Sequence, residues 1–263
     1  MKGRKLNKIF LLLFSICVLL PFLIILIWSF ADNWKYPLLL PEEFSSRGIK
    51  EVWNKQTLGI TLSSILLSSI VGLISTIIGG LTARAIVFYD FKLKKLVRFL
   101  NLLPLMIPAT AFAMGMHVIF IRMGISDTVT GVIIAQLICG LPYSVNIMTD
   151  VTTGAGNRLE EQARSLGASA FQAFFNTSFY AMMPGFLTSF CMAFIISFGQ
   201  YFVTLIFGGG AVKTLSMVMV PVINSGDRTL SASYSLMFLF STLAVFIGAN
   251  TVIKKIKTFK LYG

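Results

Sequence analysis

The chain has 263 residues, of which 56% are hydrophobic and 12% charged, and its mean hydropathy is +0.83. Because a soluble domain carries about 25% charged residues, this composition excludes an ordinary soluble domain and predicts that most of the chain lies in lipid. The net charge of +12 does not favour a nucleic-acid-binding protein, since the basic residues flank apolar runs instead of forming one patch.

Six apolar runs are long enough to cross a bilayer as helices, which takes about 20 largely apolar residues. Barrel strands would instead alternate apolar and polar residues, so helical spans are favoured. The expected fold class is therefore all-α, a polytopic membrane protein whose six transmembrane helices form a single membrane domain over residues 1–263. In chain order, the predicted spans cover residues 9–30, 57–78, 100–121, 129–148, 182–207 and 232–252.

The first run follows four basic residues and could be taken for a signal peptide. Its apolar stretch of about 22 residues exceeds the roughly 7–15 residues of a signal h-region. The residues Trp28-Ser29-Phe30-Ala31-Asp32 after it make a poor cleavage site. We therefore expect a retained first span.

Lysine and arginine residues predict the orientation of the spans. With the N-terminus inside, residues 1–8, 79–99, 149–181 and 253–263 would be cytoplasmic, and they hold 15 of the 22 Lys and Arg residues. This excess places both termini in the cytoplasm of a multi-pass protein of the cell membrane. It also makes residues 149–181, between spans four and five, a cytoplasmic loop.

The predicted outer segments are short. The largest, residues 31–56, carries Trp34 and Tyr36, aromatic residues that suit a membrane–water boundary. A triple glycine at 208–210 predicts a flexible turn. Residues 220–227 are expected to form a short re-entrant or interfacial piece.

Residues for catalysis, nucleotide binding or metal binding do not cluster in the sequence. There is no GxxxxGK[ST], no GxSxG, no HExxH and no CxxC. The three cysteines lie in separate apolar runs and are interpreted as packing residues. The one histidine, His117, lies in the third predicted span, where it either packs with a hydrogen bond or lines a pore. We expect no catalytic residue, no metal and no cofactor on this chain.

The segment from Leu159 to Pro184 is amphipathic and lies between long apolar runs. Its charged side chains are too polar for hydrocarbon, while its leucine, alanine and phenylalanine residues are too apolar for a bare loop. Gly167 can end one short helix and allow a sharp turn into the next. Glu160 with Arg164, and Arg158 with Glu161, could pair along a helix face. The segment is thus either a solvated surface helix or a docking site.

The pattern Glu161-Gln162-Ala163-x-x-x-Gly167, followed by Pro184-Gly185, resembles the cytoplasmic EAA loop of binding-protein-dependent ABC importer permeases. That family's pattern is E-A-A-x-x-x-G, nine residues, and then I-x-L-P. Here Gln162 replaces the first alanine, and residues 177–180 lack the proline. Further similarity lies in LPLMIP at 103–108 and LPY at 141–143. WxxPxLLPxxFS at 34–45 is similar to the first outer loop of spermidine/putrescine-type permeases.

This resemblance implies a permease subunit of an ATP-driven importer. Its partners would be a second permease (a homologue or a copy), two ABC ATPase subunits that bind the ATP and Mg²⁺, and an extracytoplasmic solute-binding protein. Residues 149–181 would carry a coupling helix that docks on an ATPase through Glu160, Glu161, Ala163, Arg164, Leu166, Gly167 and Ala170. The solute-binding protein would contact Arg47, Lys50 and Arg228.

Polar residues within predicted spans are candidates for a translocation path, although interhelical hydrogen bonds are the alternative for each of them. These candidates are Gln136, Asn146, Gln200, Tyr201 and Asn224. Polyamine-type relatives often have acidic residues where this chain has Gly199-Gln200. The substrate is therefore left open among polyamine, phosphonate, iron-chelate and thiamine-like solutes. The rival classes are a membrane enzyme acting on a lipid-like substrate, which would need clustered acidic residues near Asp90 or Asp150, and a channel that works without ATP.

Overall fold

The computed structural model describes residues 2–32, 34, 38 and 40–261. Over these residues the chain is helical or irregular, without a β-strand, and the single isolated β-bridge joins Ala31 to Phe44. The all-α prediction is confirmed. Tyr36, Pro37 and Leu39 of the expected outer loop lie outside the described residues.

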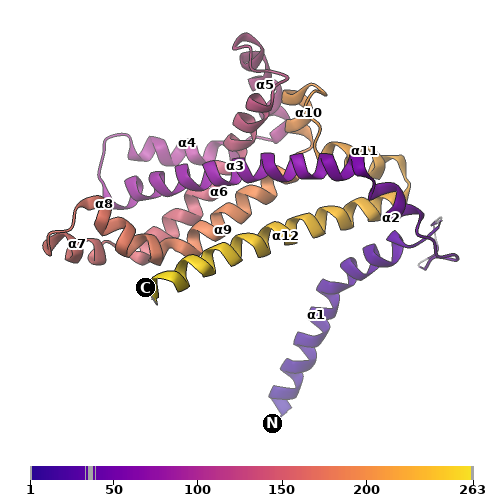
Figure 1. Cartoon of the computed structure of the whole chain (residues 1–263), viewed down its shortest axis with the longest axis horizontal. Helices are drawn as coiled ribbons and strands as arrows, with labels where there is room; N and C mark the ends of the chain where they lie inside the picture. Colours follow the sequence, from indigo (N-terminus) through magenta and orange to yellow (C-terminus); the bar gives the residue numbers. More distant parts are fainter. Residues whose placement is uncertain (1, 33, 35–37, 39, 262–263) are drawn as a thin grey trace. The chain divides into compact units, whose positions relative to one another are not determined.

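The chain, whose helices are labelled in Figure 1, divides into two compact units. One unit contains residues 1–59 and 218–241, and the other contains residues 60–217 and 242–263. The single membrane domain expected from the sequence stays a prediction. The helices α3 (Lys55–Phe88), α11 (Leu215–Ser225) and α12 (Arg228–Leu261) each have residues in both units.

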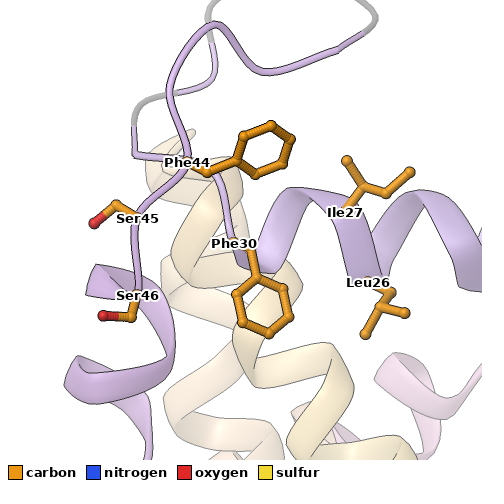
Figure 2. A pocket seen from close by; sticks show the side chains of 6 residues that line it. All are labelled: Leu26, Ile27, Phe30, Phe44, Ser45 and Ser46. Atoms are coloured by element: carbon orange, nitrogen blue, oxygen red, sulfur yellow. The ribbon is translucent and has the colours of Figure 1, made fainter.

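The first unit consists of α1 (Lys2–Ser29), α2 (Arg47–Val52) and the adjoining parts of α3, α11 and α12. The apolar side chains of α1 are largely exposed, as expected of a helix that lipid surrounds. An apolar pocket opens between the end of α1 and the loop at Phe44, and Figure 2 shows Leu26, Ile27 and Phe30 on its α1 side. The helix α2 packs closely on α12, since a Cβ at Gly48 would lie 2.5 Å from the Ser233 hydroxyl oxygen.

The second unit holds most of α3, the start of α11, the C-terminal part of α12 and seven complete α-helices, together with one π-helical turn. These are α4 (Lys94–Met106), α5 (Ala109–Arg122), α6 (Val129–Ala155), α7 (Arg158–Ser165), α8 (Ala170–Ala173), η1 (Phe174–Ser178), α9 (Phe179–Phe198) and α10 (Phe202–Gly208). Helices α3, α6 and α9 pack closely. A Cβ at Gly79 would lie 2.9 Å from the Ser144 backbone, and one at Gly185 would lie 2.8 Å from Val151.

The predicted spans are found, but not all as single helices. Five helices among the described residues are long and apolar enough to cross a membrane, and the pair α4–α5 makes a sixth candidate. The prediction of one helix over 100–121 is wrong, because α4 and α5 meet at 111°. Pro108 has no amide hydrogen to donate and disfavours a helical conformation at Ile107, whose ψ is 130°.

The boundaries around the fourth and fifth spans also differ from expectation. Helix α6 continues to Ala155, and α8, η1 and α9 together make an apolar span from Ala170 to Phe198. The loop expected at 149–181 is therefore mostly helical. The span predicted at 182–207 is interrupted after Phe198, before α10 begins. Residues 220–227, expected as a short interfacial piece, fall largely within the short apolar helix α11.

Candidate functional site

The turn between α7 and α8 depends on Gly167. The Gly167 amide donates to the carbonyl of Arg164 at 3.0 Å, and the Ala168 amide donates to that of Ala163 at 3.1 Å. These two bonds define a Schellman motif, whose central residue has a left-handed conformation; the φ of Gly167 is +93°. Glycine adopts this conformation without steric cost. The helix thus ends where the sequence predicted.

The next helix begins with a capping box. The Ser169 side chain accepts a hydrogen bond from the Gln172 amide at 3.2 Å, and the Gln172 side chain accepts one from the Ser169 amide at 3.0 Å. Both bonds satisfy amides that a helix start leaves without partners. The α7–α8 segment, residues 158–173, is consequently a compact helix–turn–helix (Figure 1).

One buried ion pair joins α7 to α3. The Arg84 guanidinium donates through Nη1 and Nη2 to the two Glu160 carboxylate oxygens, at 2.6 and 2.8 Å. The side chain of Arg84 is 22% exposed and that of Glu160 is 9% exposed. Glu160 thus pairs with Arg84 and not with Arg164, the partner that the helical spacing allowed. Because its carboxylate is bound inside the chain, its expected contact with an ATPase has no support from this geometry.

Neighbouring groups reinforce this ion pair. The Arg84 guanidinium lies over the rings of Phe174, at 4.5 Å from the centroid, and of Phe88, at 5.3 Å. The hydrogen bond from Arg84 lowers the pKa of Glu160 against the opposing effect of burial, and a hydrogen bond from Ser178 lowers it further. Glu160 is therefore held as a carboxylate at neutral pH. Arg84 was not predicted as a partner because it lies 76 residues from Glu160. Phe174 and Ser178 lie in the predicted loop 149–181 but were not predicted to be near Glu160.

The opposite side of the segment is exposed. Glu161 faces outward and accepts a hydrogen bond from Asn157 Nδ2 at 3.0 Å, instead of pairing with Arg158. Leu166 is 89% exposed and Phe171 is 71% exposed. A shallow pocket lies beside Leu166, lined also by Arg158, Glu161, Gln162 and Ser165. Of the other predicted coupling residues, Arg164 and Ala170 are exposed and Ala163 is half-buried.

The five candidates for a translocation path are not brought together. Gln136 is fully buried, donates to Thr204 Oγ1 at 2.9 Å and accepts from the Ser197 hydroxyl. These contacts match the interhelical alternative. Two further candidates are exposed: Asn146, which accepts from Asn101, and Asn224 on α11.

Gln200 and Tyr201 lie at the break between α9 and α10, both half-buried. The carbonyl oxygen of Gln200 accepts from Thr204 Oγ1 at 2.6 Å and from Ser216 Oγ at 3.0 Å. A Thr and a Ser hydroxyl thus bind a carbonyl that the end of a helix would otherwise leave without a partner.

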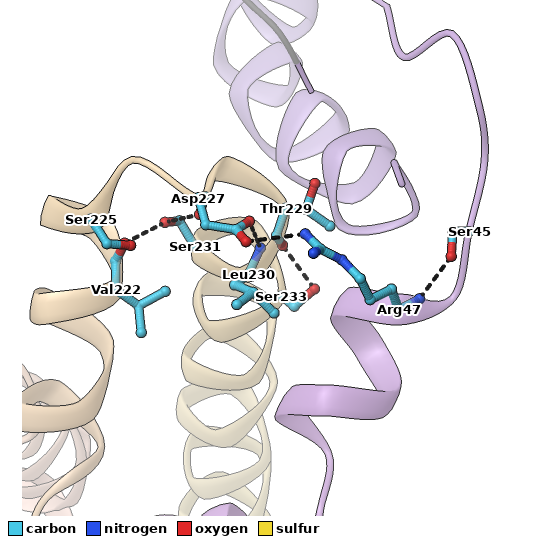
Figure 3. A network of polar contacts seen from close by, with 9 residues as sticks. All are labelled: Ser45, Arg47, Val222, Ser225, Asp227, Thr229, Leu230, Ser231 and Ser233. Carbon is cyan, nitrogen blue, oxygen red and sulfur yellow. Dashed lines mark hydrogen bonds and ion pairs between the residues drawn. The ribbon is translucent and has the colours of Figure 1, made fainter. Parts of the chain in front are cut away.

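The three predicted docking residues belong to the first unit. Arg47 Nη2 donates to Asp227 Oδ2 at 3.0 Å, as Figure 3 shows. The Arg228 guanidinium lies 4.0 Å from the centroid of the Trp34 ring, and Lys50 is exposed. Two of the three cations thus already have partners within the chain.

Comparison with known proteins gives consistent relatives. Residues 75–258 match the model of the family described as "Binding-protein-dependent transport system inner membrane component". The molybdate/tungstate transport system permease WtpB of Pyrococcus abyssi is 25% identical over 80% of this chain and 84% of its own length. The spermidine/putrescine permease PotC of Haemophilus influenzae is 22% identical over 81% and 83%.

A probable sulfate transport permease, cysT of Prototheca wickerhamii, is 29% identical, and the match covers 52% of this chain and 59% of that protein. Among solved structures, a bacterial ABC transporter involved in importing the acidic polysaccharide alginate has a chain with the same fold. Its TM-score is 0.64 at 16% identity, with 96% of this chain and 95% of that chain covered. The spermidine/putrescine type is thus one of several related types, and the similarity does not single it out.

Proposed function

Since this chain belongs to the family of binding-protein-dependent transport system inner membrane components, we propose that it forms half of the translocation path of an ATP-driven ABC importer. A small solute would arrive from an extracytoplasmic binding protein. The second half of the path would be another permease, either a copy or a homologue. ATP and Mg²⁺ would bind to two separate ATPase subunits, and this chain would carry no catalytic residue.

The exposed side of the α7–α8 segment carries this proposal. Leu166 is a large apolar side chain that stands 89% exposed on an otherwise polar helix–turn, and Phe171, at the start of the next apolar run, is 71% exposed. Such residues, rimmed by polar ones, are typical of protein–protein contacts. The segment is also rigid, because its turn is fixed by the Schellman motif and the capping box. A preformed helix pair with an apolar tip fits the cleft of an ATPase, with Glu161 facing a basic residue there.

The orientation follows from the distribution of charge. An excess of Lys and Arg favours the cytoplasm for both termini and for the α7–α8 segment. The ATPases would bind on that side, and the solute-binding protein would dock on the opposite side, near Arg47, Lys50 and Arg228.

We propose a narrower range of solutes for this chain than its relatives transport. Relatives are named for sulfate, for molybdate and tungstate, and for spermidine and putrescine. Gly199-Gln200 stands where polyamine-type relatives often have acidic residues, which would attract a polycation. We therefore propose an anionic or neutral solute, such as a phosphonate, an iron chelate or an oxyanion, in preference to a polyamine.

The membrane-enzyme alternative has less support. It requires acidic residues that cluster at a membrane face. The carboxylate of Asp90 is 99% exposed and pairs with Lys94, and Asp150 is exposed on α6.

Co-purification tests the proposal. The tagged chain, expressed with its genomic neighbours, should retain an ATP-binding subunit in mild detergent. Glu161→Lys should release that subunit while the chain stays in the membrane, because the substitution reverses the charge of an exposed contact residue. Lys92→Glu is the matched control: it reverses an exposed charge at the α3–α4 turn and should leave the complex intact. A wild-type chain that never retains an ATP-binding subunit would favour the channel or enzyme alternative.

A further inference from the structure

We propose that the ion pair of Arg84 and Glu160 is a rigid link through which the α7–α8 segment moves α3. This inference rests on the proposed function, because it assumes that an ATPase moves the segment. Arg84 and Glu160 would be positioning residues, which touch neither the ATPase nor the solute.

The geometry of the pair would fix the orientation of α7 relative to α3 as well as the distance between them. Two parallel hydrogen bonds, of 2.6 and 2.8 Å, join a planar guanidinium to a planar carboxylate. A single hydrogen bond would allow rotation about its axis, whereas two bonds fix the relative orientation of the groups. Both side chains are largely shielded from water, so exchange with solvent does not loosen them.

The same guanidinium also contacts the helical turn that follows α8. It lies over the Phe174 ring of η1, 4.5 Å from the ring centroid. Arg84 of α3 therefore contacts both Glu160, near the start of the α7–α8 segment, and Phe174, the residue that follows its end. Since α7 has only eight residues, it is too short to hold its orientation without such contacts.

The far part of α3 contacts a different region of the same unit. Ser68 lies 3.0 Å from the Ser197 hydroxyl, which donates to Gln136, and Ser64 accepts from the Leu215 amide at 2.8 Å. These partners surround the break between α9 and α10. Arg84 follows Ser68 by 16 positions, which corresponds to about 24 Å at 1.5 Å per residue.

Helix α3 is uninterrupted between these two sites and contains no proline. A displacement at Arg84 would thus reach the α9–α10 break without passing through a loop. The alternative is that the ion pair is a static anchor. In that case it would hold α7 in place, but nucleotide binding to the ATPase would not move α3.

The experiment uses the chain in complex with its ATPase, in proteoliposomes, with the native cysteines replaced. One pair of spin labels, at Gln162 and Tyr89, reports whether α7 stays fixed to the end of α3. A second pair, at Leu62 and Leu205, reports movement of α3 relative to α10. Distances are measured by pulsed electron paramagnetic resonance without nucleotide and with Mg-ATP and vanadate.

In the wild type, the 162–89 distance should stay narrow and the 62–205 distance should shift with nucleotide. Glu160→Gln should broaden the first distribution and abolish the shift of the second. Asp227→Asn, the same carboxylate-to-amide change in an exposed ion pair, should behave as the wild type. Should Glu160→Gln fail to accumulate, Arg84→Lys replaces it, because it keeps the charge but loses the two-pronged geometry; the shift should again be lost.

A wild-type shift in either variant at Glu160 or Arg84 would overturn the link. A wild-type complex that shows no shift would overturn it as well. Absence of a bound ATPase in the wild type would instead overturn the proposed function, so the two failures are distinguishable.

Discussion

Two ion pairs of the same chemical type have opposite environments in this chain. Arg84 and Glu160 form a bidentate pair whose side chains are 22% and 9% exposed. Arg47 and Asp227 form a single contact of 3.0 Å between side chains that are 43% and 32% exposed. The first pair fixes one helix to another, whereas the second leaves both groups accessible to water and to other partners. The residue types are alike, but burial decides whether a charge is structural or available for recognition.

This contrast separates the two proposed docking regions. In the α7–α8 segment the carboxylate nearest α3, that of Glu160, is paired with Arg84, and the exposed side carries Leu166 surrounded by polar residues. In the predicted outer region exposed charges such as Lys50 stand beside exposed apolar side chains such as Phe44, and Arg228 forms a cation–π pair with Trp34. A tight, shape-dependent contact is expected at the first region, and a weaker, salt-dependent contact at the second.

The largest expected effect is the difference between two matched truncations. Arg84→Ala leaves the Glu160 carboxylate shielded without its partner, which costs about 3 kcal/mol. Arg47→Ala leaves Asp227 in contact with water and should cost about 0–1 kcal/mol. Thermal unfolding of the detergent-solubilised variants measures both. Equal losses of stability in the two variants would show that burial does not make the Arg84–Glu160 pair more stabilising than the Arg47–Asp227 pair.

The turn in the α7–α8 segment gives the next largest effect. Gly167→Val forces a β-branched residue into a left-handed conformation, which costs about 1–3 kcal/mol, and should release the ATPase without expelling the chain from the membrane. Gly154→Val is the control. Both glycines have open space where a Cβ would be added, but only Gly167 has a positive φ. Co-purification reads out the result, and an intact complex with Gly167→Val would show that the turn does not shape the contact.

The pH dependence of stability sharpens the contrast. The pKa of Glu160 is lowered from 4.5 in the folded chain, so folding favours its charged form. The resulting stabilisation is present above pH 4.5 and is lost as the pH falls through the lowered value. The melting temperature of the wild type should therefore exceed that of Glu160→Gln by a constant difference from pH 7 to about pH 5. This difference should decrease in more acidic solution. A difference that grows on acidification would mean that the ion pair does not stabilise the fold.

The smallest effect is expected at the outer charges. Arg47→Glu or Lys50→Glu should weaken docking of the solute-binding protein by less than about tenfold, because rim charges act mainly on the rate of encounter. The defect should decrease as salt is added. Titration of the binding protein onto proteoliposomes at two salt concentrations measures it, with ATPase co-purification as the control for folding. Loss of both partners together would indicate unfolding.

Local signals in the sequence predicted local structure well. The spacing from Glu161 to Gly167 predicted a short helix and its end, because the Schellman turn needs only neighbouring residues. The apolar runs likewise predicted the spans, because length and apolar composition are properties of neighbouring residues. The break at Pro108 was also visible in the sequence, but the length of the apolar run was given more weight than the proline.

The environment of Glu160 could not be predicted in this way. Glu160 and Glu161 are adjacent and identical in type, and the choice of which one faces inward depends on Arg84, 76 residues away. Arg84 itself counted only as one of many cytoplasmic cations. A long-range contact of this kind leaves no periodic signal in a single sequence.

Site-specific photo-cross-linking tests the central claim most directly. A photoreactive residue is placed at position 166 or at position 44, two exposed apolar sites, one in each unit, and adducts formed in intact cells are identified by mass spectrometry. Position 166 should capture an ATP-binding subunit, and position 44 should not. An adduct with the ATP-binding subunit at position 44, or adducts at position 166 that contain no ATP-binding protein, would contradict the assignment of the α7–α8 segment as the site where ATP hydrolysis is coupled to transport.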